Sequence, residues 1–139
     1  MKTEILTGAL LLLLTFSCGQ SGRDQNVSFN ENSDQVQIVM FHLAQRCETC
    51  DAVETETESI LGNEYKNELA SGEIRFLTFE INSREGSKLA KRLRATGQGL
   101  FVVKGDSISD LTNEAFFYAY THPERYHDAL TGELGKYLR

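Results

Sequence analysis

Two cysteines three positions apart are the residues of this chain best suited to chemistry. They stand in RCETC, residues 46–50, directly before a stretch with helical periodicity. The unpaired N–H groups and the dipole at a helix N-terminus stabilise a thiolate, so Cys47 is expected to be the nucleophile. Cys50 follows one turn later on the same helix face, close enough to form a disulfide with Cys47. The pair is therefore predicted to exchange a disulfide with a substrate, and Cys50 to resolve the mixed disulfide.

Two charged neighbours are expected to act on the Cys47 thiolate in opposite directions. Arg46 places a positive charge beside it, and Glu48 places a negative charge inside the motif. A positive neighbour lowers the pKa of a thiol and a negative one raises it, so the two effects partly cancel. The direction of electron flow depends on a reduction potential that these residues do not define.

The same spacing is compatible with two other uses of the pair. In a non-catalytic binding or adaptor domain, the cysteines would form a permanent structural disulfide. As a metal site the pair supplies only two of the four ligands that structural zinc usually needs. His122 and His127 are five residues apart and straddle Pro123, which is a poor chelating arrangement. No metal or other cofactor is therefore expected, although two chains could each supply a pair of thiols, or copper(I) could bind the two thiolates of one chain.

Alternating strand and helix patterns surround the pair. Residues 36–44, VQIVMFHLA, have the β-branched and aromatic composition of a buried strand. A long helix is expected from the cysteines to about Leu69, with Gly62 as the place where it could bend. The remaining expected elements are a strand over 73–81, a short helix over 87–93, a hairpin of strands 100–103 and 107–109, and helices over about 112–120 and 124–138. This order predicts an α/β domain with a mixed sheet of about four strands and helices on both faces.

A Cys-X-X-Cys motif between a first strand and a long helix resembles the thioredoxin superfamily, and the expected order of elements matches that fold over residues 36–139. The resemblance implies that FHLAQRCETCDAVETE carries the attacking thiol, Cys47, and the resolving thiol, Cys50. It implies that Gly97, Gln98 and Gly99 belong to the loop and groove that face the cysteines. By the same resemblance the protein is a thiol–disulfide oxidoreductase whose partners are protein or small-molecule thiols and disulfides.

The chain departs from the thioredoxin pattern at three places. Arg46 stands where thioredoxins have Trp, and Glu48-Thr49 stands where they have Gly-Pro. The buried acid that helps to deprotonate the resolving thiol has its counterpart at Phe41, and the adjacent His42 is expected to point to the opposite face of the strand. No proline stands within residues 97–99, where the family has the cis-proline that shapes its substrate groove.

The N-terminal residues resemble an export signal rather than a part of the fold. Residues 1–18 have a short charged start and an apolar run too short to cross a bilayer stably. LTFSC resembles the bacterial lipobox, which implies lipid attachment at Cys18. Residues 19–35 are polar and almost free of apolar side chains, which predicts a flexible tether before a domain over 36–139. The protein is thus expected in the bacterial periplasm or cell envelope, held to a membrane by the lipid on Cys18.

Composition sets further bounds on function. The chain has 139 residues, 40% of them hydrophobic, which suits one domain of about 100 to 120 residues after the signal and tether. Its net charge is −6, and its acidic residues are scattered along the chain. The basic face of a nucleic-acid-binding protein is missing, so nucleic acid is not an expected partner.

Overall fold

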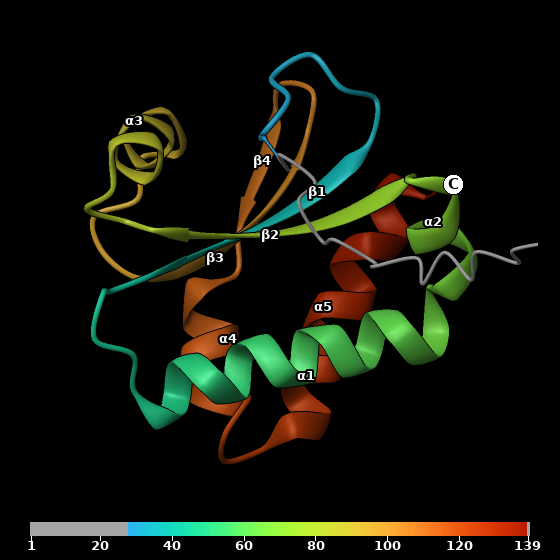
Figure 1. Cartoon of the computed structure of the whole chain (residues 1–139). Coiled ribbons are helices and arrows are strands. Elements are labelled where there is room, and N and C mark those ends of the chain that lie inside the picture. The colour runs from blue at the N-terminus through green and yellow to red at the C-terminus, as the bar shows by residue number, and fades with distance from the viewer. Residues whose placement is uncertain (1–27, 139) are drawn as a thin grey trace, which may run out of the picture.

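A computed structural model describes residues 28–138 of the chain (Figure 1). The elements are β1 (Val36–His42), α1 (Glu48–Glu64), α2 (Lys66–Ser71), β2 (Ile74–Glu80), α3 (Arg84–Leu93), β3 (Gly99–Lys104), β4 (Ser107–Asp110), α4 (Thr112–Tyr118) and α5 (Pro123–Tyr137). The predicted signal segment, residues 1–18 with Cys18, and residues 19–27 of the predicted tether lie outside the described residues. Within residues 28–138, no helix has the length and apolar composition that a membrane span requires.

The four strands form one mixed sheet in the order β2-β1-β3-β4. β1 pairs with β2 in parallel and with β3 antiparallel, and β3 and β4 form an antiparallel hairpin. β1 is an inner strand that sets the register of both its neighbours. Val39 lies opposite Leu77 of β2 on one side and Phe101 of β3 on the other. The predicted α/β class, the four-stranded mixed sheet and the hairpin are confirmed.

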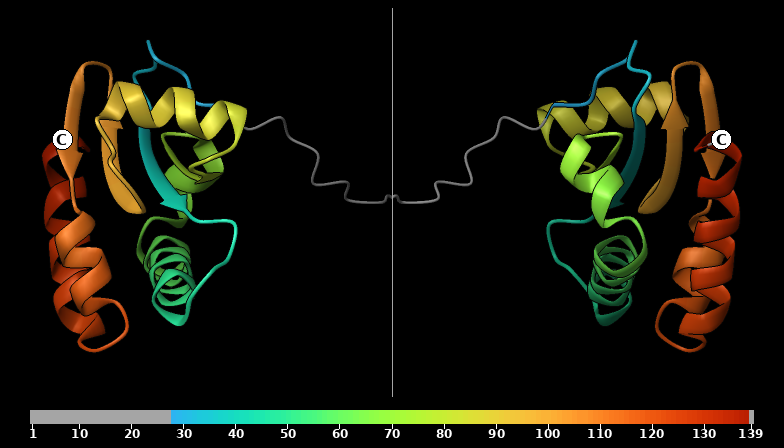
Figure 2. Two further views of the ribbon diagram at one scale, coloured as in Figure 1. Left: turned by 90° about the vertical axis from the view of Figure 1, so that its left-hand side faces the viewer. Right: turned by 90° about the vertical axis from the view of Figure 1, so that its right-hand side faces the viewer.

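Helices cover both faces of the sheet (Figure 2). Alternate residues of β1 face opposite layers, as the pleat of a strand requires. Ile38 and Met40 pack in the cluster that contains Cys50, on the face covered by α1, α4 and α5, which we call the cysteine face. Val39 and Phe41 pack toward α3 on the other side, which we call the α3 face. Six of the seven β1 residues are buried, so this strand lies at the centre of both cores.

The prediction of one helix running to about Leu69 was wrong about its end and about the position of the bend. α1 ends at Glu64, and Tyr65 interrupts the helical backbone with φ −121° and ψ 30° before α2 begins. Tyr65 packs against the core of the cysteine face, whereas Gly62 remains helical. The side chain of Tyr65 thus anchors the junction from which α2 turns back toward β2, and no feature of Gly62 is needed for the break.

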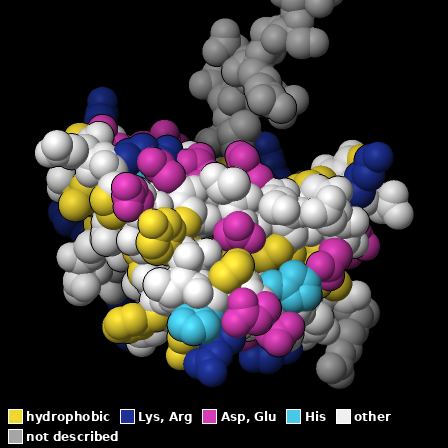
Figure 3. All heavy atoms as spheres, turned by 90° about the horizontal axis from the view of Figure 1, so that it is seen from below, with side chains coloured by type: hydrophobic (Ala, Val, Ile, Leu, Met, Phe, Trp, Pro, Cys, Tyr) yellow, Lys and Arg dark blue, Asp and Glu magenta, His cyan; other side chains and the backbone are white. Residues whose placement is uncertain are grey.

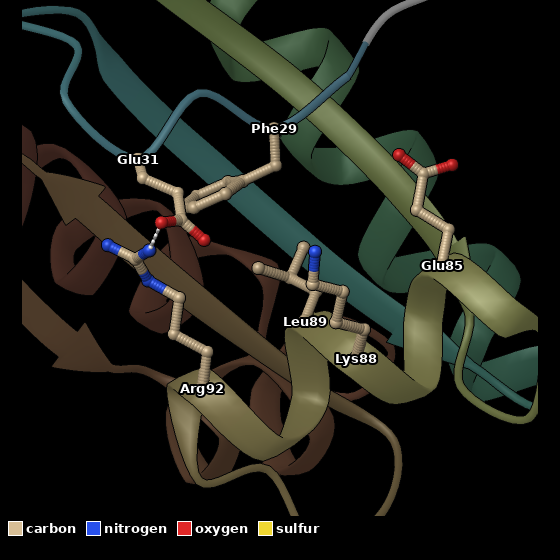
Figure 4. Close-up of a pocket in the computed structure, with 6 residues that line it drawn as sticks. All are labelled: Phe29, Glu31, Glu85, Lys88, Leu89 and Arg92. Atoms are coloured by element: carbon tan, nitrogen blue, oxygen red, sulfur yellow. Dashed lines mark ion pairs between the residues drawn. The ribbon is translucent and has the colours of Figure 1, made fainter.

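Residues 28–35, which we call the arm, lie along the domain (Figure 4). The buried side chain of Gln37 accepts a hydrogen bond from the Asn30 backbone N–H at 2.8 Å and donates one to the Asn30 carbonyl at 2.7 Å. Arg92 of α3 lies over the Phe29 ring and pairs with Glu31. The described part of the predicted tether is therefore held against β1 and α3.

A buried hydrogen bond joins α1 to α5 in the core of the cysteine face. The hydroxyl groups of Thr57 and Tyr126 lie 2.6 Å apart, and neither residue is exposed. The Thr57 hydroxyl also contacts the Val53 carbonyl at 2.5 Å, one turn earlier in α1. Because Val53 is one turn after Cys50, this contact helps to fix the half of α1 that carries the cysteine pair.

Replacing Thr57 with Val should cost more stability than replacing Tyr126 with Phe. Thr57→Val leaves the buried Tyr126 hydroxyl without its partner, at a cost of about 2 kcal/mol. Tyr126→Phe leaves Thr57 bonded to the Val53 carbonyl and should cost only about 1 kcal/mol. Urea unfolding of both variants and of the double mutant measures this, and the double mutant should cost less than the sum. The exposed Thr55→Val on the same helix is the control, and equal costs for all three single variants would contradict the assignment.

A second, exposed contact joins the C-terminal end of α1 to α5. His127 pairs with Glu64 and lies 3.2 Å from Asp128. Histidine side chains lie beside acidic ones on the surface seen from below (Figure 3). The hydrogen bond from His127 to Glu64, followed by that to Asp128, raises the pKa of the imidazole above its ordinary value. Because the protonated form is favoured in the folded state, this contact stabilises the fold most at low pH.

Stability should therefore depend on pH through His127. Its contribution is complete below the ordinary histidine pKa of about 6.5 and is lost as pH rises through the raised value of the folded state. His127→Gln should lower the free energy of unfolding at pH 5.5 by a few tenths of a kcal/mol, since the pair is exposed to solvent. At pH 8.5 the difference should vanish, as denaturant melts at both pH values would show. His122→Gln is the control, because the contacts of His122 within the described chain include no carboxylate.

Candidate redox site

The two cysteines occupy different positions at the start of α1. Cys47 is the N-cap residue, with an extended backbone at φ −121° and ψ 163°, and its carbonyl accepts the first helical hydrogen bond from Asp51 at 3.1 Å. Cys50 lies within the first turn of the helix. The loop between β1 and α1 thus presents Cys47 at the surface, while the helix directs Cys50 toward the sheet.

The two sulfur atoms are in contact without a bond. Cys47 Sγ lies 3.3 Å from Cys50 Sγ, compared with about 2.05 Å in a disulfide, and both cysteines are free in this structure. Cys47 is exposed, whereas Cys50 is completely buried. Only Cys47 is therefore accessible to a large substrate, and a small rearrangement suffices to join the two sulfurs.

The start of the helix favours the thiolate of Cys47. Hydrogen bonding from the backbone N–H of Cys50, and then from the Cys50 side chain, lowers the pKa of the Cys47 thiol below its ordinary value. The backbone N–H of Thr49 acts in the same direction, while the negative charge of Asp51 opposes it. This is the behaviour expected of a cysteine at a helix N-terminus, where unpaired N–H groups point at the sulfur.

Burial has the opposite effect on Cys50. Its side chain packs in the apolar cluster of the cysteine face with Ile38, Met40 and Leu100. Desolvation in this cluster raises the pKa of the Cys50 thiol above its ordinary value. The site therefore pairs an exposed thiol that ionises readily with a buried thiol that keeps its proton.

The charged neighbours of the pair act differently from expectation. Arg46 forms ion pairs with Asp51, at 3.2 Å, and with Glu54 on the next turn of α1. Its guanidinium group is thus bound by carboxylates and is not among the causes of the lowered pKa of Cys47, while its charge slightly favours the Cys50 thiolate. Glu48 is exposed, and the carboxylate that acts on Cys47 is that of Asp51. The acidic residues five and eight positions after Arg46 are a charge pattern from which these ion pairs could have been inferred.

One residue of the loop before β3 contacts the cysteine pair directly. The side-chain oxygen of Gln98, Oε1, lies 3.4 Å from Cys50 Sγ and accepts its S–H. Gly99 is the first residue of β3 and pairs with Phe41 of β1, which places this loop beside the end of β1. Gly97 precedes them, and a Cβ atom added to Gly97 would have no neighbour within 4 Å. Thr112, which sequence analysis did not single out, binds this loop by accepting a hydrogen bond from the Leu100 backbone N–H at 3.2 Å.

Phe41 and His42 belong to opposite faces of β1, as expected, but Phe41 is not on the side of Cys50, where its match to the buried acid of thioredoxins would place it. Phe41 packs among Phe79 and Phe101 on the α3 face, away from Cys50. By the alternation of the strand, His42 belongs to the same face as Met40, which is the cysteine face. Its imidazole Nδ1 contacts the Leu43 carbonyl at 2.9 Å, and among the described contacts it has none with either sulfur. Neither residue therefore supplies a base to Cys50 in this arrangement.

No protein-family model matches the chain, and no curated protein sequence shows significant similarity to it. Among residues 28–138, no group of three or more His, Cys, Asp or Glu side chains is arranged to hold a metal ion.

Alkylation should distinguish the two thiols by their reaction rates and by the midpoints of their pH profiles. With Cys18→Ser in both proteins, Cys47, measured in Cys50→Ser, should react with iodoacetamide along a pH profile whose midpoint lies below the ordinary thiol pKa of about 8.5. Cys50, measured in Cys47→Ser, should react more slowly and with a midpoint above that value, because it is buried. Mass spectrometry of each variant gives both profiles, with the urea-unfolded proteins as controls. Coincident profiles in the folded proteins would contradict the asymmetry of the site.

Proposed function

We propose that this protein is a thiol–disulfide oxidoreductase that acts through Cys47 and Cys50. The observation that carries the proposal is the asymmetry of the pair, an exposed N-cap thiol of lowered pKa in contact with a buried thiol of raised pKa. A disulfide that served only as a structural staple would require no such difference. The difference matches the division of labour between an attacking and a resolving thiol.

The reaction begins at the exposed sulfur. The Cys47 thiolate attacks one sulfur of a substrate disulfide, forms a mixed disulfide and releases the other substrate sulfur as a thiolate. Cys50 then loses its proton and attacks Cys47 Sγ, so that the second substrate sulfur leaves and takes up a proton. The dithiol is thereby oxidised to the Cys47–Cys50 disulfide, and the substrate disulfide is reduced to two thiols. The reverse sequence oxidises a dithiol substrate.

The arrangement of the sheet supports a thioredoxin-like fold for the domain. The cysteine pair follows the first strand, the next strand is parallel to it, and a β-hairpin extends the sheet on its other side. The loop that ends at Gly99 lies against the pair through Gln98. These are the places that the resemblance assigns to the attacking thiol, the resolving thiol and the facing loop.

We further propose that the domain works outside the cytoplasm, on a bacterial membrane to which a lipid on Cys18 anchors it. The signal-like residues 1–18 and the lipobox-like LTFSC support this location. An oxidising compartment also allows a disulfide to form and persist. The arm leads into the start of β1, while the cysteines follow its end, so the strand separates the membrane-side segment from the redox pair.

A non-catalytic adaptor with a permanent disulfide is the second candidate. It is favoured by one observation, the absence of a carboxylate or imidazole among the described hydrogen-bond partners of Cys50. Without a base the buried thiol is slow to exchange, and a disulfide formed there would be long-lived. The two candidates differ in whether the pair equilibrates with thiols in solution.

A redox titration of the full-length chain distinguishes them. Cys18→Ser leaves only two thiols, and the protein is equilibrated with graded ratios of reduced to oxidised glutathione before alkylation and intact-mass measurement. The oxidoreductase should show a reversible change of two thiols at a moderate potential. In the same background, Cys50→Ser should accumulate a mixed disulfide with glutathione and Cys47→Ser should not. A pair that stays oxidised in strongly reducing buffer would instead support the adaptor.

A further inference from the structure

Cys50 has one polar side-chain partner besides Cys47 within the described chain. Its sulfur lies 3.3 Å from Cys47 Sγ and 3.4 Å from Gln98 Oε1. Gln98 is 48 residues away in sequence, in the loop before β3. An amide oxygen only accepts hydrogen bonds, so this contact is made by the S–H of Cys50. While Cys47 is a thiolate, the Cys50 S–H can also donate to it, but in the mixed disulfide Cys47 carries no negative charge. The Cys50 proton is then directed at Gln98, and the lone pairs of the Cys50 sulfur are free to face Cys47.

The backbone around Gln98 is held in place. Gly99 pairs with Phe41 of β1, and the following N–H, that of Leu100, donates to the Thr112 hydroxyl at 3.2 Å. A Cβ atom on Gly99 would lie only 2.6 Å from Thr112 Oγ1, so the close approach of this loop to α4 requires glycine. The Gln98 side chain therefore extends from a strand end that is fixed on two sides, and its amide is directed at Cys50.

Gln98 also stands where a base would otherwise be needed. Phe41 faces the α3 layer, and the imidazole of His42 contacts the Leu43 carbonyl. Arg46, the positively charged residue directly before Cys47, is bound to Asp51 and Glu54. The described surroundings of Cys50 thus orient its proton through a neutral amide.

From these contacts we propose that Gln98 is the positioning residue of the resolving thiol, accepting the Cys50 S–H so that the Cys50 sulfur faces Cys47 for the second step. The inference rests on the proposed thiol–disulfide exchange and adds to it a residue that acts only on resolution. In that step Cys50 gives up its proton, a bond forms between Cys50 Sγ and Cys47 Sγ, and the Cys47–substrate bond breaks. The departing substrate thiolate takes up a proton, so that atoms and charge balance.

Stopped-flow reaction with 5,5′-dithiobis(2-nitrobenzoic acid) separates the two steps. The reduced full-length chain carrying Cys18→Ser should release one coloured thiolate as Cys47 forms the mixed disulfide and a second as Cys50 resolves it. Gln98→Met keeps the size of the side chain but removes the amide acceptor. It should slow the second phase about tenfold, the effect of losing one hydrogen bond, and leave the first phase within about twofold.

Two further variants keep the result decisive. Gln98→Glu retains an acceptor in the same place and adds a carboxylate that accepts the proton, so its second phase should be at least as fast as in the parent. Gln45→Ala, an exposed change in the loop before Cys47, should alter neither phase. Equal slowing of both phases in Gln98→Met would identify a structural role only and overturn the inference.

The remaining outcomes are equally informative. A second phase that is unchanged in Gln98→Met, or slowed as much by Gln98→Glu as by Gln98→Met, overturns the role of Gln98 while two-step release in the parent still supports thiol–disulfide exchange. Release of a single coloured thiolate by the parent, with no second phase, overturns both the exchange function and the role of Gln98. Thermal melting of each variant shows whether the fold is retained, and Gln98→Glu decides the matter if Gln98→Met melts early.

Discussion

The burial of β1 on both faces is the constraint on which the rest of the structure depends. The strand is paired along both edges, with β2 in parallel and β3 antiparallel, and six of its seven residues are buried. A strand of this kind needs an apolar layer on each side, so α3 must cover one face and α1, α4 and α5 the other. The chain that leaves β1 at His42 must then turn within a few residues to begin α1 under the sheet. This turn is what brings Cys50 into the core and leaves Cys47 outside it.

The difference between the two cysteines follows from the residue at which α1 begins. A helix that starts at Glu48 makes Cys47 its N-cap, where backbone N–H groups without helical partners stabilise a negative sulfur. The same start places Cys50 on the buried side of the first turn, where desolvation favours the neutral thiol. Neither effect needs a charged side chain, since Arg46 is bound to Asp51 and Glu54. The proposed chemistry therefore rests on backbone geometry and burial more than on local charges.

Patterns local in sequence allowed the sheet, its hairpin and the cysteines at the start of a helix to be predicted, because strand alternation, turn residues and helical periodicity act over a few residues. Features that depend on tertiary contacts were not predictable in this way. The break between α1 and α2 falls at Tyr65, whose side chain packs against the core. The arm is held by Gln37, a polar residue whose side chain is buried. The face on which His42 lies depends on which residues of β1 meet α3, and a strand buried on both faces carries no alternation that could reveal it.

The pleat of β1, which directs alternate side chains to opposite faces, also explains why Cys50 has an amide rather than an acid beside it. A carboxylate at position 41 would point into the α3 layer, among Phe79 and Phe101, and could not reach Cys50. On the cysteine face of β1, Ile38 and Met40 lie deep in an apolar cluster where an ionised group would be costly to bury. His42, at the end of the strand, contacts the Leu43 carbonyl instead of Cys50. The polar partner of Cys50 comes from the loop before β3, which ends at Gly99 and supplies Gln98. A neutral amide satisfies the S–H there at a lower desolvation cost than a charge, which makes the environment of Cys50 a consequence of how β1 is packed.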